Sequence, residues 1–291
     1  MTTDTRRFFI ASAILVACYA YSFYRLVRFA FREDLFSYIL LVPFISGWFV
    51  WLRRKEVSQA SSPGIRWPAL IPALAGLGLL GATRYVRVLG ERGSSGDILT
   101  LQALSFCGLL WSVGIFFLGL NKMRKLTFPA LFLIFMAPIP QPVVTKMEMA
   151  LQHLSADTAF AFIQLSGIPV YRSGLDFHMP RITLSVGPQC SGIRSTLVLF
   201  LTSLIGGNLF LRSSFPRWIF SLFVIPLGIA RNAFRILVLT MLCVHIDPSY
   251  IDSPIHRKGG PIFFILSLIP FGLALYLLRL TESSRYKRAN P

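Results

Sequence analysis

The chain has 291 residues, of which 54% are hydrophobic and only 14% are charged, and its formal net charge is +17. Its mean hydropathy is +0.63. One soluble core of this length could not hide so much apolar surface, so these values exclude an ordinary soluble protein and indicate an integral membrane protein. The positive charge is interpreted as a topology signal and as attraction to anionic lipid headgroups, and no nucleic-acid partner is expected.

Repeated apolar stretches predict an all-α fold of about eight transmembrane helices. A hydrocarbon core of roughly 30 Å needs about 20 helical residues. The predicted spans are residues 8–29, 35–52, 68–85, 98–120, 126–139, 191–211, 218–245 and 262–279. The fifth span is short because it ends at Pro138-Ile139-Pro140, where proline interrupts a helix. The first is too long for a signal peptide, so we expect it to remain as an anchor.

Basic residues in the short loops predict the orientation. They gather in the N-terminus and in alternate loops on one side of the membrane, at Arg6, Arg7, Arg53, Arg54, Lys55, Arg66, Lys122, Arg124, Lys125, Arg212, Arg217, Arg285, Lys287 and Arg288. That side is predicted to be cytoplasmic, with both termini on it. We expect one membrane domain over residues 1–291, with its catalytic half at about 186–280.

The longest segment outside the predicted spans, about residues 141–189, is expected to form an extracytoplasmic cap. Its first half has apolar residues at three- and four-residue spacing, which predicts an amphipathic helix on the membrane surface: Met147, Leu151, Leu154, Ala161 and Leu165. In its second half, apolar and polar residues alternate over 182–186 and Ser173-Gly174 supplies a turn. This pattern predicts a small β-hairpin over residues 170–186.

Cys190 is the strongest candidate for a nucleophile. With Ser191, Gly192 and Arg194 after it, Cys190 stands at the start of the sixth span, where unpaired N–H groups of a first helical turn favour a thiolate and a developing oxyanion. The other cysteines, Cys18, Cys107 and Cys243, lie inside or near the ends of apolar spans, where a thiol usually serves as a small apolar group.

Two arginines lie inside the seventh span. Counted from Trp218, seventeen residues raise Arg235 by about 26 Å, which places it near the outer interface and at the predicted level of Cys190. An arginine in a transmembrane segment indicates a functional site, although a structural arginine that extends to the interface is the alternative. Arg231 lies one turn deeper, with Asn232 beside it. The sequence favours Arg235 for chemistry and gives Arg231 and Asn232 supporting roles.

His256 lies in the predicted outer loop before the last span, where an imidazole suits proton transfer. The alternative is an exposed loop histidine without a role. No pair of histidines has the spacing of a metal site, so neither a metal nor a cofactor is expected.

The order of these signals resembles the exosortase/archaeosortase family of multi-pass membrane cysteine transpeptidases. The resemblance rests on Gly187-Pro188-Gln189-Cys190-Ser191-Gly192-Ile193-Arg194, on Asn232-x-x-Arg235-Ile236, and on His256 ahead of a Gly-Gly pair and a final span. The segments Met136-Ala137-Pro138-Ile139-Pro140 and Gly167-Ile168-Pro169-Val170 are also similar to the family. One departure is Pro188-Gln189, where acidic or alanine residues are common in the family, and it leaves the substrate motif open.

The resemblance implies an enzyme of the bacterial inner membrane that cleaves surface-protein precursors near a C-terminal sorting signal. In bacterial exosortases this signal is a motif such as Pro-Glu-Pro, a transmembrane helix and a basic cluster. The resemblance gives Cys190 the role of acyl-thioester nucleophile, Arg235 that of proton donor or oxyanion stabiliser, and His256 that of third catalytic residue. The histidine points to the bacterial branch.

Two other classes of function stay open at the level of sequence. A multi-pass transporter would explain arginines within a span, but it predicts internal repeats and paired buried acids, and the spans have almost no acids. A non-catalytic assembly factor for exopolysaccharide or surface-protein export would explain the cap and the basic loops. It predicts that Cys190, Arg235 and His256 tolerate substitution independently, whereas an enzyme predicts that each loss stops processing.

Overall fold

The computed structural model describes residues 3–60, 66–88, 95–179, 182–187, 191–252 and 259–289. The chain packs as two compact units, Met1–Val144 and Thr145–Pro291, which we describe separately. The single membrane domain expected from the sequence stays a prediction.

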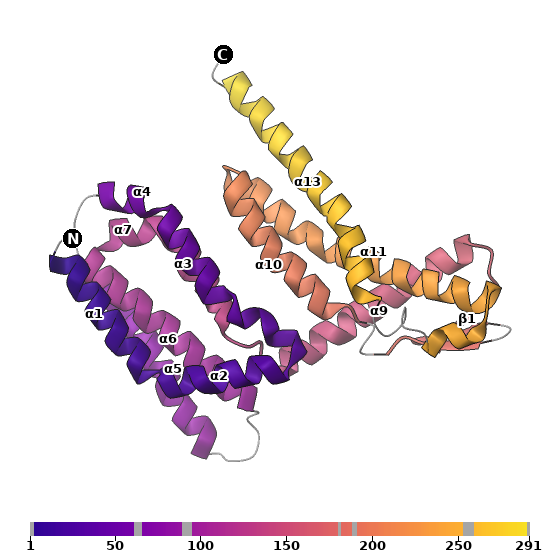
Figure 1. The fold of residues 1–291 in the computed structure, drawn as a ribbon, viewed down its shortest axis with the longest axis horizontal. Helices are drawn as coiled ribbons and strands as arrows, with labels where there is room; N and C mark the ends of the chain where they lie inside the picture. The colour runs from indigo at the N-terminus through magenta and orange to yellow at the C-terminus, as the bar shows by residue number, and fades with distance from the viewer. Residues whose placement is uncertain are drawn as a thin grey trace. The chain divides into compact units, whose positions relative to one another are not determined.

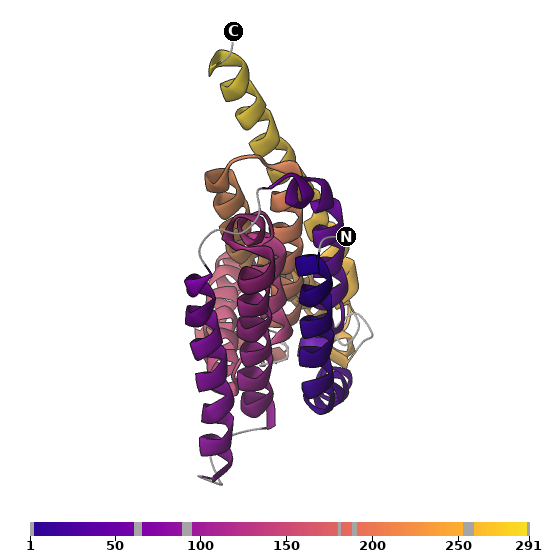
Figure 2. The same ribbon diagram turned by 90° about the vertical axis from the view of Figure 1, so that its left-hand side faces the viewer.

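The first unit is a set of helices. Its elements are α1 (Thr3–Cys18), α2 (Ala20–Arg32), η1 (Asp34–Leu40), α3 (Val42–Leu52), α4 (Arg54–Gln59), η2 (Trp67–Ala69), α5 (Leu70–Val88), α6 (Ser95–Leu118), α7 (Leu120–Lys125), α8 (Thr127–Phe132) and η3 (Leu133–Met136). Figures 1 and 2 show α5 and α6 side by side. Ser105 of α6 connects neighbouring segments, because its hydroxyl donates to the Gly76 carbonyl at 2.6 Å and lies 2.7 Å from the Tyr19 hydroxyl.

Among the described residues, six helical segments are long and apolar enough to cross a membrane. They are Asp34–Leu52, Trp67–Val86, Gly96–Leu118, Ile193–Phe210, Ser214–His245 and Gly260–Ser284. Two bent pairs, Thr3–Cys18 with Ala20–Arg32 and Thr127–Met136 with Gln141–Leu165, raise the number to eight if each pair is one span. The predicted all-α, multi-pass membrane fold is therefore confirmed.

The two bent pairs differ from the continuous spans expected at residues 8–29 and 126–139. The first pair turns by 63° at Tyr19, whose buried side chain is held at Ser105. The second turns by 92° after Met136, at the proline-rich segment that the sequence marked as a helix end. Apolar composition shows that a segment suits a membrane, but it contains no signal for the bend at Tyr19.

In the part of the second unit that the structure describes, four long helices combine with a small sheet. Its elements are α9 (Gln141–Leu165), β1 (Tyr171–Ser173), β2 (Asp176–Met179), β3 (Ile182–Ser185), α10 (Ile193–Phe210), α11 (Ser214–His245), η5 (Pro248–Asp252) and α13 (Gly260–Ala289). The amphipathic helix predicted in the cap is the long α9. The side of the membrane on which the cap lies stays a prediction.

The predicted hairpin is confirmed and extended by one strand. The strand order is β1-β2-β3 and both pairs are antiparallel. Gly174 has a φ of 64° in the two-residue turn between β1 and β2, a position that favours glycine in hairpins. On β1, Arg172 Nη1 lies 2.6 Å from Asp157 Oδ1 of α9, which ties this edge of the sheet to the helix.

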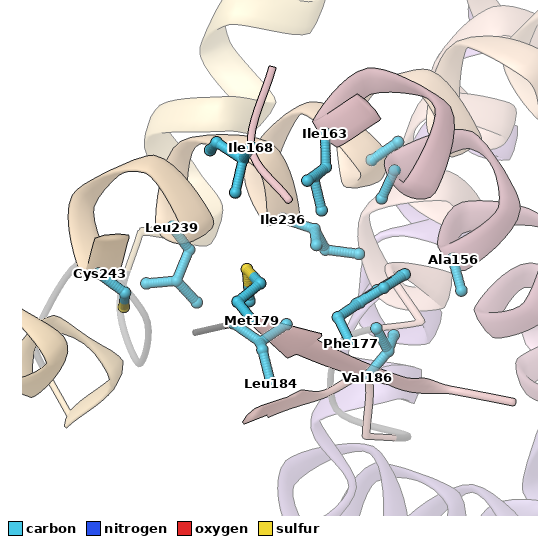
Figure 3. Packing of buried hydrophobic residues seen from close by; sticks show 12 residues of the cluster. Ala156, Ile163, Ile168, Phe177, Met179, Leu184, Val186, Ile236, Leu239 and Cys243 are labelled. Atoms are coloured by element: carbon cyan, nitrogen blue, oxygen red, sulfur yellow. The ribbon is translucent and has the colours of Figure 1, made fainter. Parts of the chain in front are cut away.

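The inner face of the sheet packs on α9 and α11 (Figure 3). Side chains from all three parts form one buried cluster, whose members include Ala156, Ile163, Phe177, Leu184, Val186, Ile236, Leu239 and Cys243. Gln152, buried on α9, donates from its side-chain amide to the Val186 carbonyl. The sheet is therefore fixed at the point where the chain leaves it towards Cys190.

The buried face of α9 differs from the apolar face expected from the sequence. Of the predicted residues, Leu151 is buried, whereas Met147, Leu154 and Leu165 are exposed. A second stripe of small residues, which includes Ala156 and Ala159, faces the sheet instead. The helix therefore has two apolar faces. One packs against the sheet, and the other is exposed on the surface of the protein.

Candidate active site

The structure describes one of the three predicted catalytic residues. Arg235 lies on α11, whereas Cys190 and His256 lie outside the described residues. The predicted convergence of these three side chains therefore stays a prediction. What the structure does show is how the first turn of α10, directly after Cys190, is held against α11.

The backbone of Gly192 forms the start of α10. Gly192 has a φ of 69°, in the left-handed region, and it is the N-cap residue of the helix. Its carbonyl accepts hydrogen bonds from the Thr196 N–H at 3.0 Å, from the Thr196 hydroxyl at 2.9 Å and from the Ser195 hydroxyl at 3.1 Å. Ser191 is buried, and its Oγ accepts a long hydrogen bond of 3.5 Å from the Ile193 N–H. Local bonds thus fix the turn that follows the predicted nucleophile.

Arg231 joins this turn to α11. Its Nη2 donates to the Gly192 carbonyl at 3.3 Å and to the Thr196 hydroxyl at 3.4 Å. The side chain is only 9% exposed, and its Nη1 is buried with no hydrogen-bond partner in the part of the chain that the structure describes. A buried guanidinium nitrogen without a partner is costly, so Nη1 is a donor available to a polar group at this position.

The two helices approach closely beside Arg231. A Cβ atom at Gly228 would lie 2.5 Å from the Thr196 Oγ1, so only glycine fits at this crossing. A Cβ atom at Gly192 would lie 3.2 Å from Arg231 Nη2 and 3.3 Å from Asn232 Cγ. The Cys190 end of α10 therefore rests on one face of α11, formed by Gly228, Arg231 and Asn232.

We expect Gly192→Ala to destabilise the protein. The left-handed backbone costs a residue with a Cβ about 1–2 kcal/mol, and the new methyl group would crowd Arg231 and Asn232. The measurement is thermal unfolding of the purified protein in detergent. Gly187→Ala is the matched control, because the Gly187 φ is not positive and nothing lies within 4 Å of its added Cβ. Equal unfolding midpoints for the two variants would contradict this account of Gly192.

Arg235 is partly buried one turn further along α11. Together with Asn232, it lines a small cavity of about 20 Å³ between α11 and the end of β3. Leu184, Ser185 and Val186 form the β3 side of this cavity. Its volume is about that of one water molecule, and most of its lining is apolar. The structure thus separates the two arginines: Arg231 binds the first turn of α10, and Arg235 faces a small space beside the sheet.

The remaining predicted residues have simpler surroundings. Asn232 is buried beside Gly192, whereas Arg194 is exposed on α10. Cys107 and Cys243 are buried, and Cys18 is exposed. Among the residues that the structure describes, no group of three His, Cys, Asp or Glu side chains is placed to hold a metal ion.

Asp247 begins the segment that leads from α11 towards His256. The hydroxyl and N–H of Ser249 form hydrogen bonds with the Asp247 carboxylate, which lower its pKa, and the N–H lies 2.7 Å from Oδ1. A negative charge therefore stands at the beginning of this segment.

A larger cavity lies in the first unit. It has a volume of about 700 Å³ and an almost entirely apolar lining, to which α1, α2, α3 and α6 contribute. None of the predicted site residues that the structure describes lines it.

Sequence analysis missed several residues that shape the site. Thr196 and Gly228 lie in apolar runs without a recognisable motif, and Gln152 stands in a helix remote in sequence from Cys190. The one available signal was the spacing of Thr196, four residues after Gly192, which suits a hydroxyl that bonds back to a helix start.

Comparison with known proteins identifies a family over most of the chain. A family model described as transmembrane exosortase matches residues 30–273. Comparison with curated proteins and with solved structures gives no match.

Proposed function

The chain belongs to the transmembrane exosortase family, and we propose that it is a membrane cysteine transpeptidase that processes sorting signals. Its substrates would be membrane-anchored precursors with a short motif, a transmembrane helix and a basic cluster at the C-terminus. We place the enzyme in the bacterial inner membrane with its active site on the extracytoplasmic face.

The observation that supports this proposal best is the fixed turn after Cys190. Four hydrogen bonds to the Gly192 carbonyl, one of them from Arg231, hold the start of α10 in one conformation. A nucleophile gains from such order, because a preset geometry avoids the entropy cost of arranging the reacting groups during the reaction. The unpaired N–H groups of the first helical turn add a positive field that favours a thiolate.

In the proposed reaction, the Cys190 thiolate attacks the carbonyl carbon of the scissile peptide bond. A carbon–sulfur bond forms, and the carbonyl oxygen becomes an oxyanion that Arg235 stabilises. The carbon–nitrogen bond then breaks, and the leaving amine takes a proton supplied by His256 or Arg235. The resulting thioester is attacked by an amine acceptor or by water, which releases the product and restores the Cys190 thiol.

A membrane-anchored substrate also favours this chemistry. Its scissile bond stays near the membrane surface, so anchoring replaces a three-dimensional search by a two-dimensional one and raises the effective concentration. Arg235, which is partly buried in an apolar helix, has fewer competing water contacts than an exposed arginine.

Trapping the thioester tests this proposal. With a co-expressed precursor that carries an affinity tag near its N-terminus, we expect a tagged adduct of the 32.7 kDa chain after rapid denaturation in acid. Neutral hydroxylamine should release the tag, because it cleaves thioesters and leaves amides intact. Mass spectrometry should place the adduct on Cys190. Cleavage of the precursor without any hydroxylamine-sensitive adduct, even when a slow acceptor is used, would contradict the thioester route.

A further inference from the structure

Among the strands that the structure describes, β3 forms one edge of the sheet, because in the order β1-β2-β3 it pairs only with β2. Backbone groups of an antiparallel strand point alternately towards the partner and away from it. The Val186 N–H donates to the Leu175 carbonyl at 3.0 Å, so Val186, and with it Leu184 and Ile182, face β2. The backbone groups of Thr183 and Ser185 therefore point outwards.

Three of the four outward backbone groups of Thr183 and Ser185 are available for a partner within the described segments. The Ser185 carbonyl accepts a hydrogen bond from the Gly187 N–H at 3.1 Å. Within the described segments, no hydrogen bond is formed by the N–H of Thr183, the carbonyl of Thr183 or the N–H of Ser185. Both side chains are polar and exposed. The edge thus presents two donors and one acceptor in the alternating pattern of an unpaired strand.

This edge adjoins the candidate active site. Ser185 lines the small cavity together with Asn232 and Arg235. Along the chain, β3 ends five residues before Cys190, and the Val186 carbonyl is held by Gln152. The unpaired edge of β3 therefore lies beside buried Asn232 and partly buried Arg235, and the chain leads from this edge to Cys190.

We propose that a precursor binds by adding its extended segment to β3 as a fourth strand, just before the scissile bond. This inference rests on the proposed function, because it supplies the binding mode for that same reaction. Outward groups on alternate residues of a strand repeat about every 6.6–6.8 Å, and only another extended peptide matches this spacing with donors and acceptors. Main-chain pairing would fix the direction of the substrate and carry its scissile carbonyl past Arg235.

The binding mode also predicts how selectivity is divided. Hydrogen bonds to the main chain are common to all peptides, so they contribute affinity without reading side chains. Side chains of the bound segment would alternate between the side that faces Asn232 and Arg235 and the opposite side. Substitutions at neighbouring positions of the bound segment should therefore change the rate of processing by different amounts, according to the side that each side chain faces.

Proline substitutions test the edge. In Thr183→Pro and Ser185→Pro, the outward N–H is lost while the pairing with β2 stays, a situation in which edge strands tolerate proline. We expect each variant to process a co-expressed precursor, with one transmembrane helix and a C-terminal arginine cluster, at least about fivefold more slowly than the corresponding alanine variant. The alanine variant lacks the hydroxyl but keeps the backbone N–H, so the comparison with it isolates the effect of losing the N–H.

The opposite edge provides the matched control. Arg172 of β1 stands between Tyr171 and Ser173 in the pairing with β2, so its N–H also points away from the sheet. Arg172→Pro also loses the ion pair with Asp157, a hydrogen bond to the Gly174 carbonyl and the contacts of the guanidinium with the Phe160 and Phe177 rings, so it is compared with Arg172→Ala, which loses them equally. We expect the processing rates of these two variants to agree within about twofold. A thermal unfolding curve for each variant shows whether it is folded.

A folded Thr183→Pro variant that processes the precursor as fast as Thr183→Ala would overturn the strand proposal. If the proline variants do not fold, disulfide cross-linking decides. Thr183→Cys in the Cys190→Ala background is paired with precursors that carry single cysteines at successive positions before their transmembrane helix. Strand addition predicts cross-links at every second position, and equal cross-linking at all positions overturns it. Processing that survives Cys190→Ala alone would instead overturn the proposed function, so the two failures are distinguishable.

Discussion

Cys190→Ala is expected to abolish precursor processing, with a loss of at least about a thousandfold, because no other group can form the proposed thioester. The precursor should accumulate at its full length in membranes while the variant is present in normal amounts. Immunoblots of cells that co-express the precursor measure the ratio of full-length to processed protein.

The other cysteines provide the control for Cys190. Cys18 is exposed on α1, so Cys18→Ala changes a thiol without creating a cavity in a core. We expect it to process the precursor normally. Full processing by Cys190→Ala would remove the nucleophile from the mechanism, and equal losses in both variants would indicate a general effect of cysteine replacement.

Arg235→Gln and Arg231→Gln are expected to fail in different ways. Arg235 lines the small cavity, so its loss should slow processing by about 100- to 1,000-fold, as when one oxyanion donor is removed, with little change in stability. Arg231 is buried and donates to Gly192 and Thr196, so its loss should lower the free energy of unfolding by about 1.5–3 kcal/mol. Thermal unfolding and processing are measured on both variants.

Each of the two variants is a control for the other, because each removes one guanidinium from α11 and the two positions are four residues apart. Low temperature should restore much of the activity of Arg231→Gln, since more of the protein is then folded, and should not restore that of Arg235→Gln. If Arg231→Gln were stable but inactive and Arg235→Gln were active, Arg231 would have the catalytic role and Arg235 would not.

The membrane fold was predictable from the sequence because its main determinant is local composition. A run of about 20 apolar residues has few stable arrangements other than a helix across the bilayer. The small sheet was also accessible, because alternation over residues 182–186 and the glycine at position 174 are local signals. The bend at Tyr19 was not, because the hydroxyl that Tyr19 contacts there belongs to Ser105, a residue 86 positions away.

The candidate site was likewise predictable from the sequence only in part. Cys190, Arg235 and His256 were found because reactive or charged side chains are unusual in such a chain, and their convergence remains a prediction. The contacts that hold α10 against α11 were not foreseen, since Gly228 and Thr196 resemble ordinary residues of an apolar helix. Their role follows from an approach of two helices that are distant in sequence, which local patterns do not encode.

The crossing of Thr196 and Gly228 makes three positions dependent on one another. Thr196 supplies one hydroxyl to the Gly192 carbonyl and to Arg231, while its bulk leaves room only for hydrogen at Gly228. Serine at position 196 would keep the hydroxyl, and with it the oxygen that would lie 2.5 Å from a Cβ atom at position 228. Alanine at 228 therefore requires a residue without this hydroxyl at 196, which gives up the hydrogen bonds with Gly192 and Arg231. Natural variation is thus expected to couple these positions, and a single replacement at either one would misrepresent how freely the pair can evolve.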